Sequence, residues 1–406
     1  MLKTFYRFIS KPLALSAFCV AIVTTSCQDS FEEKTVLEAE DLVAFSNGDL
    51  IPGQYIVVLN EGNITFRKSG SYEEIQSAMR KGASDLLSKY RISGENLNAV
   101  YGSTLNGFAV SLTDDELALL KSDPAVSYIE QDRVIALAPP SSSSEVTATS
   151  SQTVPYGIAR VRGGENYTGN NVAYVIDTGI QLNHDDLNVD ASKGFNAFTR
   201  GRDGKDLDDG NGHGTHVAGT IGAIDNSIGV IGVAAGATVV PIKVLDSRGS
   251  GSTSGVIAGV DFVGANGKAG DVANMSLGGG ASKGLDDAVL AASSKGIWFV
   301  LAAGNSSDDA NKYSPARVNG TYIYTVSAMD ENDNWASFSN FGNPPIDWCA
   351  PGVRINSTWI SNGYRAISGT SMAAPHVAGI RLLGNVSQDG TVKNDPDGNP
   401  DKISVR

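Results

Sequence analysis

The sequence predicts a doubly wound α/β domain with a mostly parallel sheet, preceded by a smaller α+β domain. Three observations support this prediction. Apolar strand patterns alternate with helical patterns between residues 154 and 383, which is typical of a parallel sheet with helices on both faces. A shorter run of strand and helix patterns occupies residues 51–137. Residues 138–153 lie between the two and are rich in Ser and Pro, so we interpret them as a linker without a core of its own.

The first 27 residues have the pattern of an export signal. Three basic residues precede the apolar run 13–23, which is too short to span a bilayer comfortably. The run ends in Thr-Thr-Ser-Cys27, where a small residue before a cysteine resembles the processing site of bacterial lipoproteins. We therefore predict export from a bacterial cell, a lipidated Cys27 and a flexible tether over residues 28–50. A plain secretory signal with an incidental cysteine is the alternative.

Residues 51–137 have the pattern of a small α+β domain. Apolar runs of alternating character predict strands, and amphipathic runs that open on polar or acidic residues predict helices. The predicted strands cover 54–59, 107–112 and 126–130, and the predicted helices cover 71–90 and 114–121.

Residues 154–406 have the pattern of the larger domain. The predicted strands cover 172–176, 239–245, 272–277 and 297–302. The predicted helices begin at His213, cover 254–262 and 285–295, and begin again at Ser371. The last helix stops by Gly384 and leaves a polar tail, so we expect no further helix after it. In sheets of this kind, ligands bind at the carboxyl ends of the strands.

Composition excludes several classes of function. Lys and Arg total 31 and Asp and Glu total 44, which gives a formal net charge of −13. A protein that binds nucleic acid or an anionic membrane surface needs clustered basic charge instead. The three cysteines cannot build a disulfide framework. Hydrophobic residues make up 41% of the chain and charged residues 18%, so a sizeable core can be buried.

Two segments in the first half of the larger domain contain candidate catalytic residues. Asp177 directly follows the predicted strand 172–176, where a carboxylate could orient an imidazole. His213 lies among the small residues of segment 212–220, which let the start of a helix approach other backbone closely. Taken singly, Asp177 could be an ordinary turn residue after a strand, and His213 could be a hydrogen-bonded histidine of the core. A metal site of His213 and His216 would lack the spacing and the glutamate of a zinc-peptidase helix.

Two later segments supply a nucleophile and an amide. Ser371 follows Gly369-Thr370 at the start of a predicted helix, where the helix dipole favours developing negative charge. Asn305 follows the predicted strand 297–302, and its amide can donate to an oxyanion. As isolated features, these would be an N-cap serine and a polar loop residue.

Together these segments resemble the subtilisin-like serine peptidases, close to the proteinase K branch. The order of Asp177, His213 and Ser371 along the chain is that of subtilisins. The resemblance runs from residue 154 to residue 379, and residues 51–137 resemble the inhibitory propeptide of the family. It implies a subtilisin-like fold for residues 154–406 and a propeptide domain before it.

The resemblance also implies a serine endopeptidase that works through an acyl-enzyme. Ser371 would be the nucleophile, His213 the general base and then acid, and Asp177 the residue that holds the imidazole. Asn305 and the backbone N–H of Ser371 would form the oxyanion hole. The remaining histidines are expected to be structural: His184, His216 and His376.

Substrate contacts follow from the same resemblance. A strand edge would pair with the extended peptide, and Gly-rich, apolar walls predict broad specificity with an apolar or aromatic side chain before the scissile bond. The expected residues are Gly249, Ser250 and Gly251 for the edge, and Ser276, Leu277, Gly278, Gly279, Ala302, Ala303 and Gly304 for the walls. We expect a monomer that acts on proteins or peptides, without nucleic acid and without a cofactor for catalysis. It would contact a membrane only through a lipid anchor.

Structural calcium is a further implication. Asp347 matches the carboxylate of a calcium site in proteinase K-like enzymes, where carbonyls near Thr321 and Ile323 would complete it. Segment 395–401 has oxygen ligands at alternate positions, but its two prolines suit a plain turn equally well. Cys349 has no expected partner and is predicted to be a buried apolar filler.

Maturation is predicted inside the linker. Pro139 and Pro140 follow the propeptide and would hinder cleavage, because proline lacks an N–H and is rigid. We therefore expect cleavage between Ser141 and Gln152. One alternative function is a non-catalytic surface lipoprotein on a degenerate peptidase fold, against which the intact Asp177, His213, Asn305 and Ser371 speak. Another is a dinucleotide-binding protein, but the first strand–helix unit of the larger domain lacks the G-x-G-x-x-G turn that this function needs.

Overall fold

The computed structural model describes residues 46–60, 70–137 and 151–406 and the backbone of residues 144–146. The predicted signal peptide, Cys27 and residues 28–45 of the predicted tether lie outside these residues. Within the described part, helices are all too short or too polar to cross a membrane.

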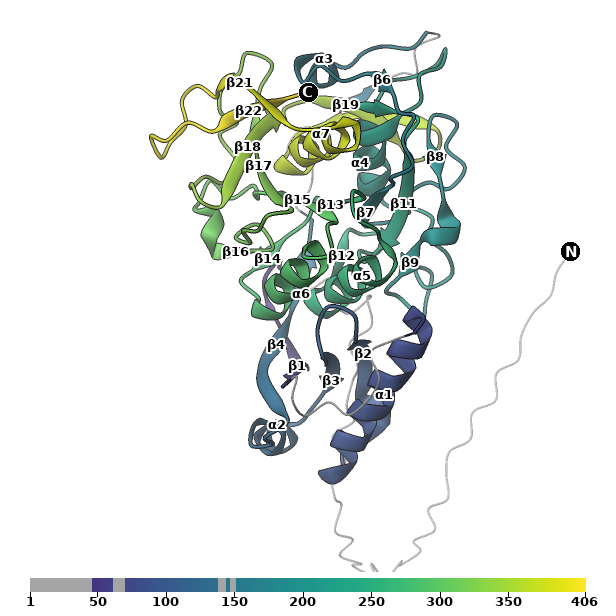
Figure 1. Ribbon diagram of the computed structural model, residues 1–406, viewed down its shortest axis with the longest axis vertical. Coiled ribbons are helices and arrows are strands. Elements are labelled where there is room, and N and C mark those ends of the chain that lie inside the picture. Colours follow the sequence, from purple (N-terminus) through teal and green to yellow (C-terminus); the bar gives the residue numbers. More distant parts are fainter. Residues whose placement is uncertain (1–45, 61–69, 138–143, 147–150) are drawn as a thin grey trace, which may run out of the picture. The chain divides into compact units, whose positions relative to one another are not determined.

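The smaller domain is an antiparallel sheet with strand order β4–β1–β3–β2 and two helices (Figure 1). Both helices begin with a capping box, in which Ser71 and Thr113 exchange hydrogen bonds with Glu74 and Glu116. Strand β2 was not predicted. The elements are β1 (Leu50–Leu59), α1 (Tyr72–Lys89), η3 (Gly94–Asn96), β2 (Leu97–Tyr101), β3 (Gly107–Ser111), α2 (Asp114–Lys121) and β4 (Val126–Ala136).

The predicted tether ends earlier than expected. Leu50 already belongs to β1, and the N–H of Gly48 donates to the carbonyl of Val134 over 2.9 Å. Residues 46–50 are therefore part of the smaller domain.

Alternate residues of β1 serve two different cores, as the two-residue period of a strand requires. Val57 packs with Met79 and Leu87 of helix α1. Ile56 belongs instead to a cluster with Val256 of helix α5 (Thr253–Asn266) in the larger domain. One face of the small sheet thus covers its own helices, and the other face packs against the larger domain.

The larger domain is built on one sheet with strand order β21–β22–β18–β17–β15–β13–β7–β11–β8, and β9 also pairs with β11. The pairs from β18 to β8 and β9 are all parallel. The strands are β7 (Ala173–Asp177), β8 (Asn188–Val189), β9 (Phe195–Asn196), β11 (Thr238–Lys243), β13 (Val272–Met275), β15 (Trp298–Ala302), β17 (Ile323–Met329), β18 (Ile346–Pro351), β21 (Ser387–Thr391) and β22 (Lys402–Val405).

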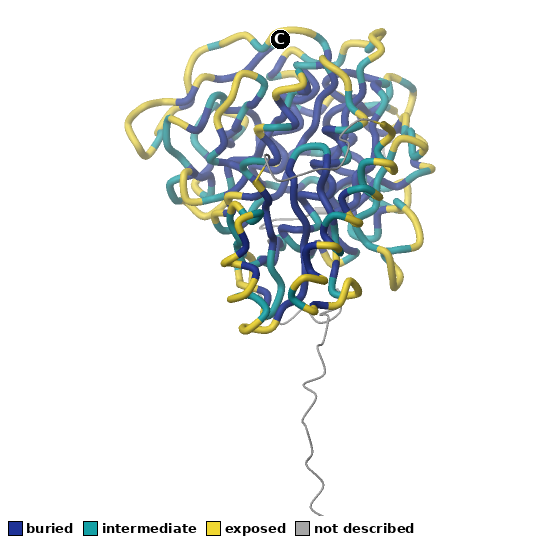
Figure 2. Tube along the Cα trace, turned by 60° about the horizontal axis from the view of Figure 1, so that its bottom comes forward, coloured by how far each residue is buried: buried dark blue, intermediate teal, exposed yellow. Residues whose placement is uncertain are grey.

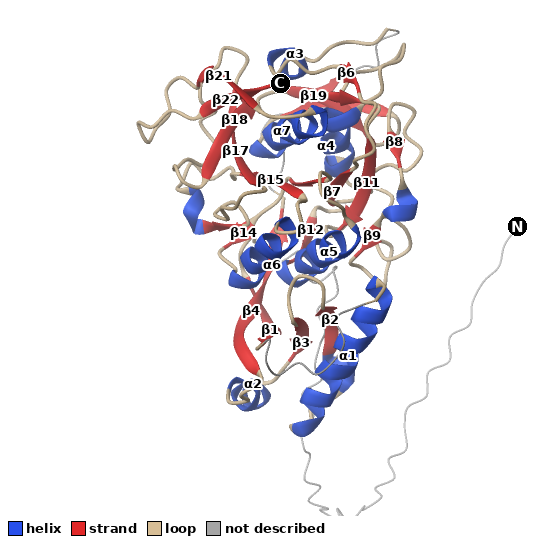
Figure 3. Ribbon diagram, viewed as in Figure 1, coloured by secondary structure: helices blue, strands red, loops and turns tan. Residues whose placement is uncertain are grey.

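Helices cover both faces of this sheet (Figure 3). Helices α4 (His213–Gly222) and α7 (Thr370–Leu383) share a core with Val175 of β7. Helices α5 (Thr253–Asn266) and α6 (Lys283–Ser293) share a core with Ile176 on the opposite face. Buried residues follow the strands, and exposed residues gather in the turns (Figure 2). This arrangement confirms the predicted doubly wound α/β domain.

Short elements surround the main sheet. Strand β5 lies within the predicted linker and pairs antiparallel with β20. The remaining elements are α3 (Tyr156–Arg160), β6 (Glu165–Asn166), η4 (Ala191–Lys193), β10 (Ala234–Ala235), β12 (Ser250–Ser252), β14 (Gly279–Gly280), η5 (Ala310–Lys312), β16 (Tyr313–Ser314), β19 (Ile355–Trp359), β20 (Gly363–Ile367) and β5 (Ser144–Val146).

The polar tail forms a hairpin that the sequence analysis missed. Strands β21 and β22 pair antiparallel, and β22 adds to the edge of β18, with Ile403 opposite Cys349. Cys349 is a buried free thiol packed against Met329, Val392 and Ile403, so its prediction as an apolar filler is confirmed. The hairpin completes the sheet edge beside β18.

Candidate active site

The predicted site residues lie at the carboxyl ends of three adjacent strands and at two helix starts. Asp177 ends β7, Ser276 follows the end of β13, and Asn305 lies shortly beyond the end of β15. His213 begins α4, and Ser371 is the second residue of α7. Because β15, β13 and β7 are neighbours in a parallel sheet, their carboxyl ends share one edge.

Asp177 and His213 form a hydrogen-bonded pair. The Nδ1 atom of His213 lies 2.8 Å from Oδ1 and 2.9 Å from Oδ2 of Asp177. The Asp177 side chain is fully buried, and that of His213 is 12% exposed. The backbone carbonyl of Asp177 also accepts from the N–H groups of Val244 and Leu245, which fixes the end of β7. This geometry makes Nδ1 a donor and leaves Nε2 as the acceptor.

The charge on His213 is favoured by its neighbours. Burial alone would lower the pKa of the imidazole, but Asp177 and then Asp209 raise it, and the net pKa is raised above 6.5. The buried rings of His216 and His376 have no such carboxylate, and burial lowers the pKa to about 3 and about 4 respectively. His216 and His376 hydrogen-bond to backbone carbonyls. His184 does so through Nε2, which lies 3.4 Å from the carbonyl of Gly363, while its Nδ1 accepts from the N–H of Asp186.

Ser371 is held close to Ser276. The Ser371 hydroxyl donates to the carbonyl of Ser276 over 3.0 Å, and the Ser276 hydroxyl donates to the carbonyl of Ser371 over 2.7 Å. The side chain of Asn274 donates in turn to the Ser276 hydroxyl. The hydroxyl hydrogen of Ser371 must therefore turn away from Ser276 before it can point at an imidazole.

Asn305 is oriented by Thr370, a residue that the sequence analysis did not select. The Oδ1 atom of Asn305 accepts from the N–H of Thr370 at 2.9 Å and from its hydroxyl at 3.0 Å. The Thr370 hydroxyl accepts in turn from the N–H of Gly304. Because Oδ1 is occupied in this way, the Nδ2 group of Asn305 is the free donor of the amide. The only sequence signal was a hydroxyl beside Ser371.

The predicted substrate edge is paired with the smaller domain. Strand β12 is antiparallel to β4, with Ser250 opposite Ala136 and Gly251 opposite Ile135. The N–H of Leu137 donates to the carbonyl of Gly249 over 2.9 Å. The segment that precedes the linker thus lies along the strand edge predicted to bind a peptide.

The predicted pocket walls lie beside this strand. A Cβ atom added to Gly279 would lie 2.6 Å from Cδ1 of Ile135, so a larger residue there would force that side chain to shift. Gly278 accepts through its carbonyl from the amide of Asn47. Leu277, Ala302 and Ala303 are buried, and Gly304 has a positive φ of 104°. Of the predicted wall residues, Gly279 lies against Ile135 of β4 and Leu277 shares a cluster with that side chain, whereas Ala302 and Ala303 belong to other clusters.

The predicted cation ligands make other bonds. Asp347 accepts from the N–H of Thr325 over 2.9 Å, and burial raises the pKa of its carboxyl to about 6. In segment 395–401, Asp395 accepts from the N–H groups of Asp397 and Asp401, as in a chain of turns. Within residues 46–60, 70–137 and 151–406, no three His, Cys, Asp or Glu side chains are grouped to hold a metal ion. One carboxylate oxygen of Asp347 remains available for a cation held mainly by carbonyls.

Comparison with known proteins gives consistent matches. A model of the subtilase family matches residues 170–384, and a model of peptidase inhibitor I9 matches residues 54–138. Alkaline serine exoprotease A of Vibrio alginolyticus is 41% identical over 360 residues, which are 86% of this chain and 62% of that protein. The chain therefore spans less than two thirds of that relative.

Two further matches extend the comparison. The extracellular serine proteinase of Thermus sp. (strain Rt41A) is 40% identical over 382 residues, which are 89% of this chain and 87% of that protein. The crystal structure of a cold adapted subtilisin-like serine proteinase is 41% identical, with a TM-score of 0.52 over 61% of this chain and 96% of that chain.

Proposed function

The chain belongs to the subtilase family of serine peptidases, and we propose that it is a self-processing endopeptidase whose catalytic triad is Asp177, His213 and Ser371. The observation that carries the proposal is the hydrogen-bonded pair of Asp177 and His213, with Nδ1 facing the carboxylate over 2.8 and 2.9 Å. This pair holds the tautomer in which Nε2 can accept a proton.

The proposed reaction proceeds through an acyl-enzyme. Oγ of Ser371 attacks the peptide carbonyl carbon while its proton passes to Nε2 of His213, and Asp177 stabilises the imidazolium. The carbonyl oxygen becomes an oxyanion that accepts from Nδ2 of Asn305 and the N–H of Ser371. His213 then gives its proton to the leaving amine as the carbon–nitrogen bond breaks. Water, deprotonated by His213, hydrolyses the ester and restores Ser371. This chemistry needs no cofactor.

Residues 51–137 would act as an intramolecular, product-like inhibitor. Strand β4 occupies the edge of β12 in the way an extended substrate would, and Leu137 carries this pairing to Gly249. The apolar Ile135 lies against Gly279. That contact supports an apolar substrate side chain at the position of Ile135 in the cleft. The broad specificity with an apolar or aromatic side chain before the scissile bond is proposed from the resemblance to the family alone.

Maturation is proposed within the linker, between Ser141 and Gln152. The N–H groups of Gln152 and Thr153 donate to carbonyls of the catalytic domain, so the chain is anchored from Gln152 onward.

Export agrees with the Thermus relative, whose name calls it extracellular. We further propose a monomer, lipidation at Cys27 and a calcium ion at Asp347. Mass spectrometry of the mature protein tests the cleavage position, and a start at Pro139 would contradict it.

The central test uses Ser371→Ala. We expect this variant to lose both peptide hydrolysis and self-processing, and to escape labelling by a serine-directed fluorophosphonate that labels the wild type. Processing of the variant precursor in the absence of wild-type enzyme would refute the assignment of the nucleophile. A wild-type protein that folds but takes no label would favour a non-catalytic binding protein.

A further inference from the structure

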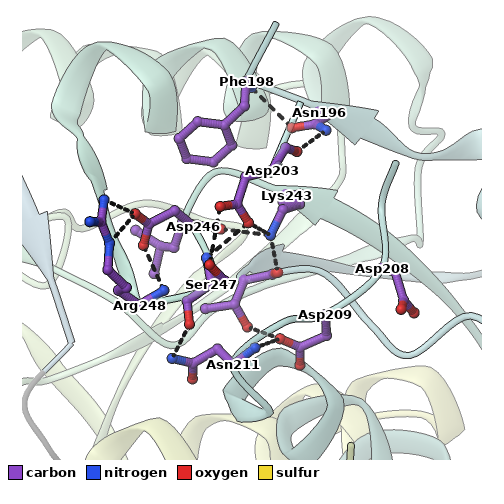
Figure 4. Close-up of polar contacts among 12 residues, drawn as sticks. Asn196, Phe198, Asp203, Asp208, Asp209, Asn211, Lys243, Asp246, Ser247 and Arg248 are labelled. Atoms are coloured by element: carbon purple, nitrogen blue, oxygen red, sulfur yellow. Dashed lines mark hydrogen bonds and ion pairs between the residues drawn. The ribbon is translucent and has the colours of Figure 1, made fainter. Parts of the chain in front are cut away.

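Asp209 is a buried carboxylate that the proposed mechanism leaves unused. It lies in the loop before α4, is 5% exposed and is the one buried residue among the acids at 203, 206, 208 and 209. Its sequence neighbour Asp208 points elsewhere, whereas Asp209 bonds to Asn211 (Figure 4). A loop carboxylate loses hydration when it is buried, so its partners must compensate for that loss.

Five donors satisfy the Asp209 carboxylate. Oδ1 accepts from the N–H groups of Asn211 and Gly212 at 2.8 and 2.9 Å and from the hydroxyl of Thr178 at 2.9 Å. Oδ2 accepts from the N–H and the hydroxyl of Thr215 at 3.0 and 2.7 Å. Three of these donors are backbone N–H groups, which cannot act as acceptors. Burial raises the pKa of Asp209, and these bonds oppose that rise by stabilising the ionised form.

These bonds fix the start of the helix that carries His213. The N-cap of α4 is Gly212, which has a positive φ of 110° and no side chain to cap the helix. Asp209 supplies the missing acceptor, because it receives the N–H groups of Gly212 and Thr215 in the first turn. His213 lies between these two anchored residues.

Asp209 is also connected to Asp177, the hydrogen-bond partner of His213. Thr178 directly follows Asp177, and its hydroxyl donates to Asp209 while accepting from the N–H of Gly214. On its other side, the carbonyl of Thr178 accepts from the ammonium of Lys243 over 2.7 Å. Asp209 thus joins the turn after Asp177 to the helix start that bears His213.

We propose that Asp209 is a positioning residue for the catalytic base, which fixes His213 against Asp177 and places a second negative charge beside the imidazole. This proposal rests on the proposed triad. It goes beyond the triad because the donors to Asp209 come from Thr178, Asn211, Gly212 and Thr215, none of which is a triad residue.

The charged groups around His213 allow the two roles of Asp209 to be separated. Asp177 and Asp209 are the anions that raise the pKa of His213, whereas burial lowers it. His216 lies on the same helix and is neutral in the working range, since its pKa is about 3. Lys243 is paired with Asp203 at 3.1 Å. Replacing Asp209 by Asn removes one anion, together with the hydrogen bonds that the amide nitrogen cannot accept, and does not alter His216, Lys243 or Asp203.

The experiment measures kcat/KM against pH for Asp209→Asn and for a matched control. The control is Asp186→Asn, another buried carboxylate of the same domain, which accepts from Asn226, Val230 and Tyr364. We expect the midpoint of the acid limb to fall by about half a pH unit or more in Asp209→Asn and to stay in place in Asp186→Asn. An unchanged midpoint in a folded Asp209→Asn enzyme would overturn the charge role.

A second variant tests positioning alone. Thr178→Val keeps the shape of the side chain at 178 and the charge of Asp209. It removes the hydroxyl that donates to Asp209 and accepts from the N–H of Gly214. We expect a lower kcat at the alkaline plateau with an unmoved midpoint, and an unchanged kcat would overturn the positioning role.

A variant that fails to mature can still be tested in the precursor. Ser371→Ala and Ser371→Ala/Asp209→Asn precursors are compared by NMR titration of the His213 ring. A lower pKa in the double variant supports the proposal, and equal pKa values contradict it. This readout does not depend on catalysis, so a failure of the triad assignment would appear separately, as activity retained by Ser371→Ala.

Discussion

Carboxylates, most of them buried, organise both the active site and the contact with the propeptide, but their hydrogen-bond donors come from different parts of the chain. Asp177 and Asp209 are satisfied by residues 178 to 215 of the catalytic domain itself. Glu130 and Asp132 lie on the propeptide strand β4 and accept from the first turns of α6 and α5. Asp261 reverses the direction, since this residue of α5 accepts from the propeptide.

The location of the donors distinguishes the permanent bonds within the active site from the temporary bonds between the catalytic domain and the propeptide. In the proposed maturation, the active-site bonds would survive because both partners stay in the catalytic domain. The interface bonds would cap two helices only while the propeptide is present, and afterwards Asp261 and the N-termini of α5 and α6 would return to water. Glu130 makes three such bonds, to the Ser282 hydroxyl and to the N–H groups of Lys283 and Gly284.

The hydrogen bond between Asp177 and His213 belongs to the permanent bonds, and its loss should have the greatest effect on activity. Asp177→Asn should lower the rate of precursor self-cleavage by about 10⁴-fold, because the amide no longer holds the tautomer that His213 needs. The contact with the propeptide should be unaffected, since Asp177 is not part of it. The measurement is the first-order rate of processing of the purified precursor, with circular dichroism to check the fold. A loss of less than about tenfold would contradict the role of Asp177.

The hydrogen bonds between Glu130 of the propeptide and the start of α6 belong to the temporary contact. Glu130→Ala removes three hydrogen bonds to one carboxylate, and we expect the cleaved propeptide to bind about 10²-fold more weakly. Activity should therefore appear sooner after processing, while kcat of the fully mature enzyme stays unchanged, because Glu130 has left with the propeptide. Asp115→Ala, an exposed acid on α2, is the matched control and should leave release unchanged. Equal release rates for both variants would contradict the capping role.

The fold was predictable where local pattern and burial agree. The apolar run 172–176 ending in Asp177 indicated a central strand, because a strand covered on both faces reads as a continuous apolar run. The hairpin of β21 and β22 was not predictable in this way. Its strand β21 is polar and mostly exposed, so pairing with β22, which itself adds to the edge of β18, determines its conformation rather than local pattern.

The site was predictable only as far as its motifs reach. Asp177, His213, Asn305 and Ser371 each stand in a distinctive segment. Asp209 does not, because the loop from 203 to 209 contains four aspartates and only the tertiary contact with Thr178 distinguishes the buried one. Thr370 was missed for the same reason, since its contact with Asn305 joins residues far apart in the chain.

A smaller effect concerns acidity at the interface. Burial raises the pKa of Asp132 to about 6 in the precursor, and it raises the pKa of Asp261 as well. The bound form therefore takes up protons that the separated parts do not, so binding strengthens as the pH falls through this range. We expect the dissociation constant of the cleaved propeptide to fall about tenfold between pH 7 and pH 5. Asp132→Asn should flatten this dependence, and a dissociation constant that rises on acidification would contradict it.

The smallest effect is a displacement of the catalytic titration. The pKa of His213 is raised above its ordinary 6.5, chiefly because Asp177 outweighs the effect of burial. As the proposed base, His213 would have to be neutral to accept the proton of Ser371, so kcat/KM of the mature enzyme should fall as the pH drops through a midpoint above 6.5. Acidification thus acts on both regions in the same direction, because it protonates the base and tightens the propeptide. A midpoint below 6.5 in the mature enzyme would contradict this prediction, because it would show that burial lowers the pKa of His213 by more than Asp177 and Asp209 raise it.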